Sequence, residues 1–204
     1  FKKEFGLQEE QLAANQNLQP ETLFDELLTK VPAGSDGLML QPYWSPSNGD
    51  GPETRGAIIG FNEEHTRAHL YRAMIEGLTY ALRESKELLE KRSKKTISRL
   101  IVSGGGSHSD EVMQITADIF GITVFRPHTF ETSSLGAAIA SAVGIGLYPD
   151  FSSAVDKMTH PGKRFDPIDA NQKIYNDLYH KVYKKMYGNL KPSYEAIWSI
   201  TNRA

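Results

Sequence analysis

A glycine-rich segment between two predicted elements carries the strongest chemical signal in the sequence. An apolar, strand-like run is followed by Gly104, Gly105 and Gly106, and Ser109 stands where the next helix should begin. Glycine lets a backbone approach a ligand closely, and a helix N-terminus offers unpaired N–H donors at the positive end of the helix dipole. These features suit the ribose and phosphates of a nucleotide, but they also suit a tight turn with a Ser or Asp cap. The pattern is neither the phosphate-binding lysine motif nor the dinucleotide fingerprint, so the residues alone leave both interpretations open.

A second candidate is the small-residue segment 131–140. Its glycine and alanines predict a helix that packs tightly against another element of the core. Only the hydroxyl side chains at the start of this helix, Thr132, Ser133 and Ser134, are placed to reach a ligand. We therefore expect a core helix whose first turn alone could take part in binding.

The third candidate is the segment Gln41-Pro-Tyr-Trp44, taken together with Arg55. An aromatic pair at a strand end can line a cleft, and an arginine can form paired hydrogen bonds with a phosphate. The alternative is an aromatic pair packed beneath the following loop, 45–54, and the sequence favours this packing role.

Three further spacings favour structural roles. His65 and His69 have metal-ligand spacing on a helix but lack the glutamate of a catalytic zinc motif, so we expect no metal site. Arg72 and Glu76 predict an i,i+4 pair on a solvated helix face, worth a few tenths of a kcal/mol. A tyrosine stripe at four-residue spacing predicts a packing face and not a nucleic-acid platform; its members are Tyr175, Tyr179, Tyr183 and Tyr187.

Composition narrows the function classes. Of the 204 residues, 39% are hydrophobic and 24% charged, which predicts one large domain or two small ones. Lys and Arg number 23 against 25 Asp and Glu, so bulk charge argues against nucleic acid or a membrane surface as partner. The absence of cysteine excludes disulfides, thiol catalysis and thiolate metal sites. No apolar stretch reaches the roughly 18–20 residues that span a bilayer, and no signal peptide opens the sequence. We expect a cytoplasmic protein.

The elements that must position these residues alternate in type. Apolar runs predict strands near 38–40, 57–60, 99–102 and 122–125, and helical periodicity predicts a long helix over 63–91. This alternation predicts an α/β fold in which 99–102 and 122–125 pair in parallel through a right-handed crossover. We divide the chain into a helical segment, 1–36, an α/β core, 37–160, and C-terminal helices, 161–204.

The order of the motifs resembles the C-terminal part of the FGGY family of carbohydrate kinases. The resemblance covers roughly residues 37–157. The matching pieces, in the family's order, are Pro42-Tyr-Trp44, Arg55-Gly-Ala-Ile-Ile-Gly60, His69-Leu-Tyr-Arg-Ala73, Glu76-Gly-Leu-Thr-Tyr80, Ser103-Gly-Gly-Gly-Ser-His-Ser-Asp110, Met113-Gln114, Ala117-Asp118, Glu131, Leu135-Gly-Ala-Ala138 and Gly144-Ile-Gly146.

The resemblance implies a ribonuclease-H-like, actin-like ATPase domain, incomplete at its N-terminus and carrying extra helices. It implies transfer of the terminal phosphoryl group of ATP, with Mg²⁺, to a hydroxyl of a sugar or polyol. It also implies that Gly104, Gly105 and Gly106 hold the backbone near the nucleotide and that Ser109 contacts it. Glycerol kinases have Asn at the position of Ser109, and their loop is shorter than 45–54, so the resemblance points away from that subgroup.

In the family, the catalytic aspartate and most of the sugar pocket precede the matching region. We therefore expect them upstream of Phe1, in a missing N-terminal domain, and we expect the 204 residues alone to be inactive. Asp110 and Asp118 match ordinary helix positions of the family, so no catalytic residue is assigned here. A homodimer is compatible with the resemblance. Two alternatives stay open, a non-catalytic actin-like module that binds nucleotide and a plain structural domain.

Overall fold

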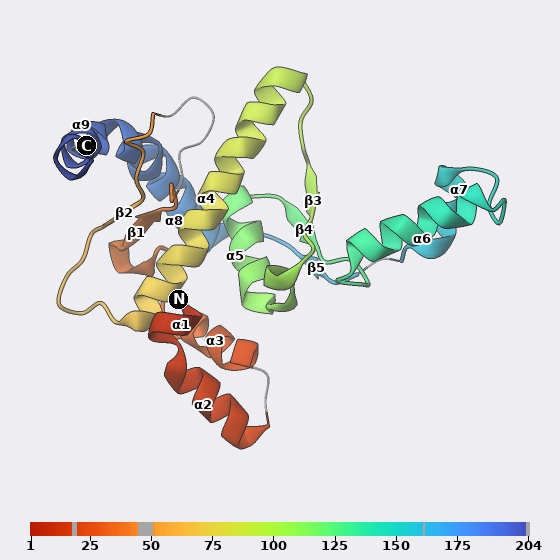
Figure 1. Cartoon of the computed structure of the whole chain (residues 1–204), viewed down its shortest axis with the longest axis horizontal. Coiled ribbons are helices and arrows are strands. Elements are labelled where there is room, and N and C mark those ends of the chain that lie inside the picture. Colours follow the sequence, from red (N-terminus) through yellow and green to blue (C-terminus); the bar gives the residue numbers. More distant parts are fainter. Residues whose placement is uncertain (18–19, 45–50, 161, 203–204) are drawn as a thin grey trace.

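The computed structural model describes residues 1–17, 20–44, 51–160 and 162–202. A long central helix, α4 (Arg67–Ser93), organises the molecule, and α3 (Pro20–Thr29), β1 (Met39–Gln41) and α5 (Asp110–Phe120) pack along it (Figure 1). On one side of α4 lie the N-terminal helices, which are α1 (Lys2–Phe5), α2 (Leu7–Gln16) and α3 (Pro20–Thr29). The C-terminal helices are α8 (Asp169–Leu178) and α9 (Lys184–Thr201).

The strands form two small sheets. β1 (Met39–Gln41) pairs antiparallel with β2 (Ala57–Ile59). β3 (Arg99–Ile101) pairs in parallel with β4 (Thr123–Phe125), and β4 pairs antiparallel with β5 (Arg164–Phe165). The four predicted strands and the parallel pair are thus confirmed, with Leu100 opposite Val124. β5 has only two residues, which is too short for a periodic signal in the sequence.

The helix predicted over 63–91 begins later, at Arg67, and ends at Ser93. The segment before it is held in a turn, where the Asn62 side chain accepts a hydrogen bond from the Glu64 N–H. His69 Nδ1 accepts from the Thr66 N–H, which satisfies one of the free donors at the helix start. The helix ends where Lys94 adopts a left-handed conformation, a common helix terminator.

The core lies between α4 and the C-terminal helices. Tyr175, Tyr179 and Tyr183 are fully buried and contact the ring of Tyr80 on α4, with centroid distances of 6.2, 5.8 and 5.0 Å. The predicted packing face is therefore confirmed for these three, whereas Tyr187 is half-buried and packs on Tyr43 and Tyr194. Each step of four residues overshoots an α-helical turn by about 40°, so such a stripe would wind away from α4. A π turn, η3 (Tyr179–Tyr183), winds more widely and keeps the tyrosines on one side.

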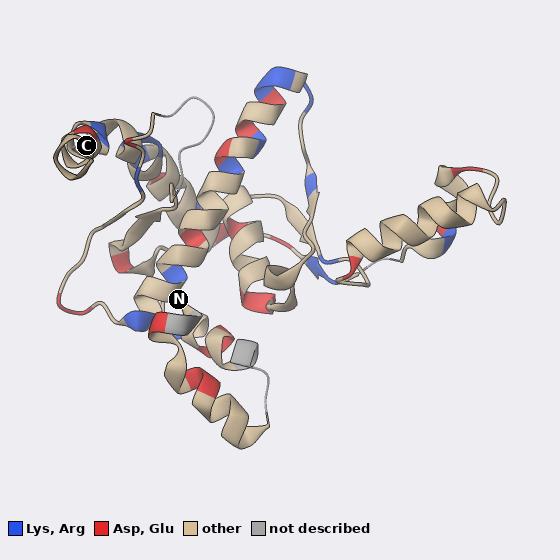
Figure 2. Cartoon of the chain, viewed as in Figure 1, with Lys and Arg blue, Asp and Glu red and all other residues tan. Residues whose placement is uncertain are grey.

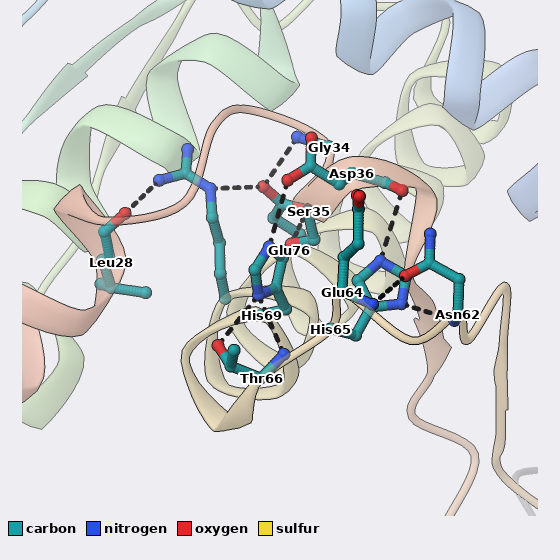
Figure 3. Close-up of polar contacts among 11 residues, drawn as sticks. Leu28, Gly34, Ser35, Asp36, Asn62, Glu64, His65, Thr66, His69 and Glu76 are labelled. Atoms are coloured by element: carbon teal, nitrogen blue, oxygen red, sulfur yellow. Dashed lines mark hydrogen bonds and ion pairs between the residues drawn. The ribbon is translucent and has the colours of Figure 1, made fainter.

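The prediction of a solvated pair at Arg72 and Glu76 is wrong. Both side chains are buried, and Arg72 Nε lies 2.9 Å from Glu76 Oε1. Figure 3 shows the Glu76 carboxylate among donors from other elements. It accepts from the Gly34 N–H at 3.1 Å, while its second oxygen accepts from Ser35 Oγ at 3.0 Å. The Tyr175 hydroxyl donates to it at 2.7 Å.

Arg72 completes this buried network. Its guanidinium also donates to the Leu28 carbonyl at 2.6 Å and to the Tyr175 hydroxyl at 2.8 Å. Burial raises the pKa of the Glu76 carboxyl, and the neighbouring Arg72 and the hydrogen-bond donors partly offset that rise. The network joins α3, the turn before β1, α4 and α8. The i,i+4 spacing of Arg72 and Glu76 on α4 therefore serves long-range packing and is not the mark of a surface ion pair.

The small-residue helix α6 (Thr132–Gly144) forms an arm with α7 (Phe151–Met158) that projects from the rest of the molecule (Figure 1). The prediction of a core helix is wrong, since only Ile139 and Ala142 of α6 are buried. The arm carries few charges (Figure 2). Small side chains permit close packing but require a partner, and in the described residues α6 packs mainly on α7. No helix in the described ranges is both long and apolar enough to cross a membrane.

Candidate functional site

A cavity of about 430 Å³ opens where the two parallel strands end. The chain leaves β3 at Ile101 and β4 at Phe125, so the following loops share the carboxyl edge of the small sheet. In α/β folds, ligands bind preferentially at this edge. The cavity is lined by Ser103, Gly104, Gly105 and His108 from the first loop and by Phe130, Glu131, Thr132 and Ser133 from the second.

The glycine turn has an open surface toward this cavity. Gly104 has φ 93° and ψ −174°, a conformation nearly restricted to glycine. Gly105 opens a short 3₁₀ turn, η2 (Gly105–His108). Buried Ser107 fixes this turn, because its N–H and its hydroxyl both donate to the Gly104 carbonyl, at 3.0 and 2.7 Å. A Cβ built on Gly104 or Gly105 would meet no protein atom within 4 Å. A ligand can therefore reach the backbone here without steric conflict.

The other two residues of the predicted site face elsewhere. Gly106 lines a separate apolar cavity of about 480 Å³ beside α4, and a Cβ there would lie 4.0 Å from Val112. Ser109 caps helix α5 (Asp110–Phe120), since its Oγ accepts from the Val112 N–H at 3.0 Å. This is the structural role that the sequence left open, and a nucleotide contact by Ser109 stays a prediction.

The start of α6 forms the opposite wall of the cavity. Ser103 Oγ and Thr132 Oγ1 lie 3.1 Å apart, within hydrogen-bond distance, and thereby link the two loops. Thr132 and Ser133 line the cavity, whereas Ser134 does not. The first and second candidate segments thus meet in one place. Hydroxyl groups and the first N–H groups of a helix can both donate to phosphate or ribose oxygens.

Sequence reasoning missed an aromatic pair at the same site. The rings of His108 and Phe130 stack with centroids 3.6 Å apart and planes inclined by 16°. Arg126 supports them, because its guanidinium lies 5.9 Å from the Phe130 ring and its Nη2 donates to the His108 carbonyl at 3.4 Å. His108 lies within the glycine-rich segment but was given no role from the sequence, and Phe130 belongs to no recognisable motif. The one sequence signal is the position of His108, one 3₁₀ turn after Gly105.

The acidic residues nearest the turn are engaged in structural contacts. Asp110 forms ion pairs with Arg126, at 2.7 Å, and with Lys163. Hydrogen bonds from Lys163 and Arg126 hold the pKa of the Asp110 carboxyl below its usual value. Asp118 is buried and accepts from the Ile168 N–H and from the Asn171 side chain, both at 2.8 Å. Both contact patterns agree with ordinary helix positions and supply no free carboxylate for proton transfer.

The third candidate segment lies apart from this cavity. Gln41, Pro42 and Tyr43 line a different cavity of about 540 Å³ with residues of α4 and of the C-terminal helices. Trp44 is 61% exposed, and the Arg55 guanidinium lies 5.2 Å from the Trp198 ring. Most of the loop that was expected to cover the aromatic pair, residues 45–50, lies outside the described residues.

His65 and His69 are held by other partners. The Nδ1 of His65 accepts from the Asn62 N–H at 2.9 Å, and that of His69 accepts from the Thr66 N–H. His69 Nε2 therefore carries the proton that it shares with Asp36 Oδ2, at 3.1 Å (Figure 3). Within the ranges that the structure covers, no group of three or more His, Asp or Glu side chains is placed to hold a metal ion.

The amino-acid sequence of the chain is similar to those of known carbohydrate kinases. The sequence model of the FGGY family of carbohydrate kinases, C-terminal domain, matches residues 3–145. The chain is 37% identical over 189 residues to the uncharacterized sugar kinase YgcE of Escherichia coli strain K12, covering 91% of this chain and 38% of YgcE. It is 34% identical over 172 residues to a xylulose kinase of Lactococcus lactis strain IL1403, covering 81% and 34% of the two chains.

The fold comparison agrees with the sequence comparison. The crystal structure of xylulose kinase from Rhodospirillum rubrum matches with a TM-score of 0.73 and 30% identity, covering 86% of this chain and 35% of that one. The chain thus spans less than two fifths of the length of the relatives it matches. The matched region includes every residue that lines the cavity. The chain belongs to the FGGY family of carbohydrate kinases, and its residues 3–145 match the C-terminal domain of that family.

Proposed function

We propose that this chain is the nucleotide-side portion of an ATP-dependent carbohydrate kinase. The complete enzyme would transfer the terminal phosphoryl group of ATP to a hydroxyl of a sugar or polyol. The observation that carries the proposal is the cavity at the carboxyl ends of β3 and β4, where Gly104 and Gly105 leave space against the backbone. Its volume of about 430 Å³ lies in the range of small-molecule sites.

Each side of the cavity contributes something a nucleotide needs. The N–H groups of the glycine turn and of the first turn of α6 are donors for phosphate or ribose oxygens. The hydroxyls of Ser103, Thr132 and Ser133 add further donors. We include Gly106 and Ser109 in the proposed nucleotide segment because they belong to the same turn. Gly106 faces the apolar cavity beside α4, and the Ser109 hydroxyl caps α5.

Phosphoryl transfer depends on positioning and on charge stabilisation across a whole cleft. We assign the catalytic aspartate and the sugar pocket to the part of the protein outside these 204 residues. We assign no Mg²⁺ ligand to the described residues, since they hold no suitable group of acidic side chains; the ion would be bound by phosphate oxygens and by the other part of the cleft. Within this chain, the glycine turn and the start of α6 bind and orient the nucleotide.

The exposed surfaces of the small sheet support an incomplete fold. β3 has one neighbouring strand, β4, among the described residues, and Ile101 on β3 is 67% exposed. Leu78 and Leu82 of α4 are also exposed, and they line the apolar cavity of about 480 Å³ together with Leu100 of β3. A parallel sheet is normally covered on both faces. We assign 1–36 to helices that continue from the upstream domain, 37–160 to the nucleotide-side core and 161–204 to helices that pack on that core. The last segment also adds β5 to the core sheet, beside β4.

The proposal is tested with the full-length protein that contains this chain. A phosphorylation screen with ATP against pentuloses, hexonates and polyols should identify an acceptor, and we expect the enzyme in the cytoplasm. Binding of nucleotide without phosphorylation of any acceptor would favour the non-catalytic actin-like module. The absence of nucleotide binding would leave only a structural domain.

A further inference from the structure

Two aromatic side chains in separate loops form a stacked pair beside the glycine turn. His108 ends η2, Phe130 lies in the loop after β4, and both line the cavity that contains Gly104 and Gly105. Their centroids lie 3.6 Å apart at 16°, so Phe130 covers one face of the imidazole. His108 is exposed, and its free surface is therefore the other face and the ring edge, beside the cavity.

The winding of η2 puts this ring and the open glycine on the same side. A 3₁₀ helix has three residues per turn, so residues three apart are eclipsed at a rise of about 6 Å. Gly105 and His108 are the first and last residues of η2. A ligand that approaches the Gly105 backbone therefore also meets the imidazole of His108.

We propose that His108, backed by Phe130, is the stacking platform for the purine base of the nucleotide. The inference rests on the proposed nucleotide site and extends it to recognition of the base. Flat aromatic rings stack on base faces, and a purine overlaps such a ring more fully than a pyrimidine does. The platform therefore favours purine over pyrimidine nucleotides without any hydrogen bond to the base.

The charged group in the cavity fixes the orientation of the ligand. Glu131 lines the cavity and repels phosphate, but its carboxylate can accept hydrogen bonds from ribose hydroxyls. The phosphate chain is thereby directed toward the N–H groups of the glycine turn. The base is left to occupy the aromatic side, against His108.

The platform is held in place by contacts that do not involve the ligand. Arg126 reaches the His108 carbonyl and the Phe130 ring, and its ion pair with Asp110 joins it to the first turn of α5. The Ser103–Thr132 contact, at 3.1 Å, links the same two loops a second time. A site organised before binding spends less free energy on ordering side chains.

The test is calorimetric titration of the full-length protein with ADP, UDP and inorganic tripolyphosphate. The variants are His108→Ala, His108→Trp and the control Phe61→Ala. Phe61 is an exposed phenylalanine outside the cavity, and its ring centroid lies 6.0 Å from that of His65. We expect His108→Ala to weaken ADP binding at least about tenfold, to weaken UDP binding less and to leave tripolyphosphate unchanged. We expect Phe61→Ala to bind ADP within about twofold of the wild type. His108→Trp should keep its ADP affinity, and its added fluorescence should be quenched when ADP binds.

The outcomes separate the platform from the nucleotide site. If the wild type binds ADP and His108→Ala binds it equally well, the platform is refuted and the nucleotide site stands. If His108→Ala loses affinity for all three ligands equally, His108 has a structural role and the platform is again refuted. If the wild type binds no ADP, the proposed nucleotide site fails, and the platform fails with it.

Discussion

The substitution Gly105→Val in the full-length protein tests whether the open side of the glycine turn is ligand space. A Cβ at Gly105 would meet no protein atom within 4 Å, and Gly105 is not among the residues with positive φ. The folded chain should therefore accept valine with a change in stability of no more than about 0.5 kcal/mol, the scale of the helix-propensity difference between the two residues. A bound nucleotide would instead meet the isopropyl group on the face that Gly105 shares with His108.

We expect Gly105→Val to raise the Michaelis constant for ATP at least about tenfold, a loss of roughly 1.4 kcal/mol in apparent binding. The Michaelis constant for the sugar should change much less, because we assign the sugar pocket to the other domain. Both constants and the melting temperature are measured on one preparation.

A glycine outside the site provides the matched control. Gly37 has φ 91° and a Cβ there would meet no protein atom within 4 Å, so Gly37→Ala should cost about 1–3 kcal/mol in backbone strain without touching the cavity. For a unit of this size that lowers Tm by roughly 2–4 °C per kcal/mol. The pair of variants thus separates loss of binding from loss of stability. A folded Gly105→Val protein with wild-type ATP kinetics would remove this glycine from the site, and an unstable one would leave only its role in the turn.

Three further predictions follow from the network, the ion pairs and the missing cleft. Glu76→Ala leaves the Arg72 guanidinium buried without its partner, so it should lower the free energy of unfolding in urea by about 3–5 kcal/mol. The control Asp177→Ala removes an exposed pair with Lys181 and should lower it by less than about 1 kcal/mol. Equal losses for the two variants would contradict the buried network. The pKa of the Asp110 carboxyl is lower in the folded state than in the unfolded state, where it is about 3.9. The stability that Asp110 contributes is therefore present at a pH above the unfolded-state pKa and is lost as the pH falls through the folded-state pKa. The difference in unfolding midpoint between wild type and Asp110→Asn should therefore shrink from pH 6 toward about pH 3, and a constant difference would refute the ion pairs. The purified 204 residues should phosphorylate no sugar with ATP; turnover above a heat-killed control would place a catalytic base in this chain.

Local patterns in the sequence were enough to predict the elements around the site. Apolar runs located β3 and β4, and the right-handed crossover rule gave their parallel pairing. The four-residue tyrosine spacing predicted a packing face, although not the π turn that keeps Tyr179 and Tyr183 aligned with Tyr175. These signals succeed because periodicity reports directly on which side of an element is buried.

Features that depend on partners distant in the sequence could not be predicted. The i,i+4 spacing of Arg72 and Glu76 reveals nothing of Gly34, Ser35 and Tyr175, which turn a surface pattern into a buried network. The small residues of α6 suit close packing, but the described part of the chain supplies little beyond α7 to pack against.

The aromatic platform was missed for a related reason. His108 and Phe130 come from two loops that meet only because β3 and β4 are neighbours. His108 lies in the glycine-rich segment, but nothing in the sequence connects it with Phe130, so the pair becomes visible only once the strand pairing is known. The glycine turn could be found earlier because all its parts are adjacent in the sequence.

Hydrogen exchange of the full-length protein, with and without ADP, tests most directly the claim that the nucleotide binds at the carboxyl ends of β3 and β4. Free backbone N–H groups that donate to a ligand exchange more slowly when it is bound. The account predicts that within this chain protection is strongest in 103–108 and 130–133, the two segments that contain the residues lining the cavity. Protection confined to 41–44 and 183–188, around the separate cavity, with the glycine turn unchanged, would contradict it.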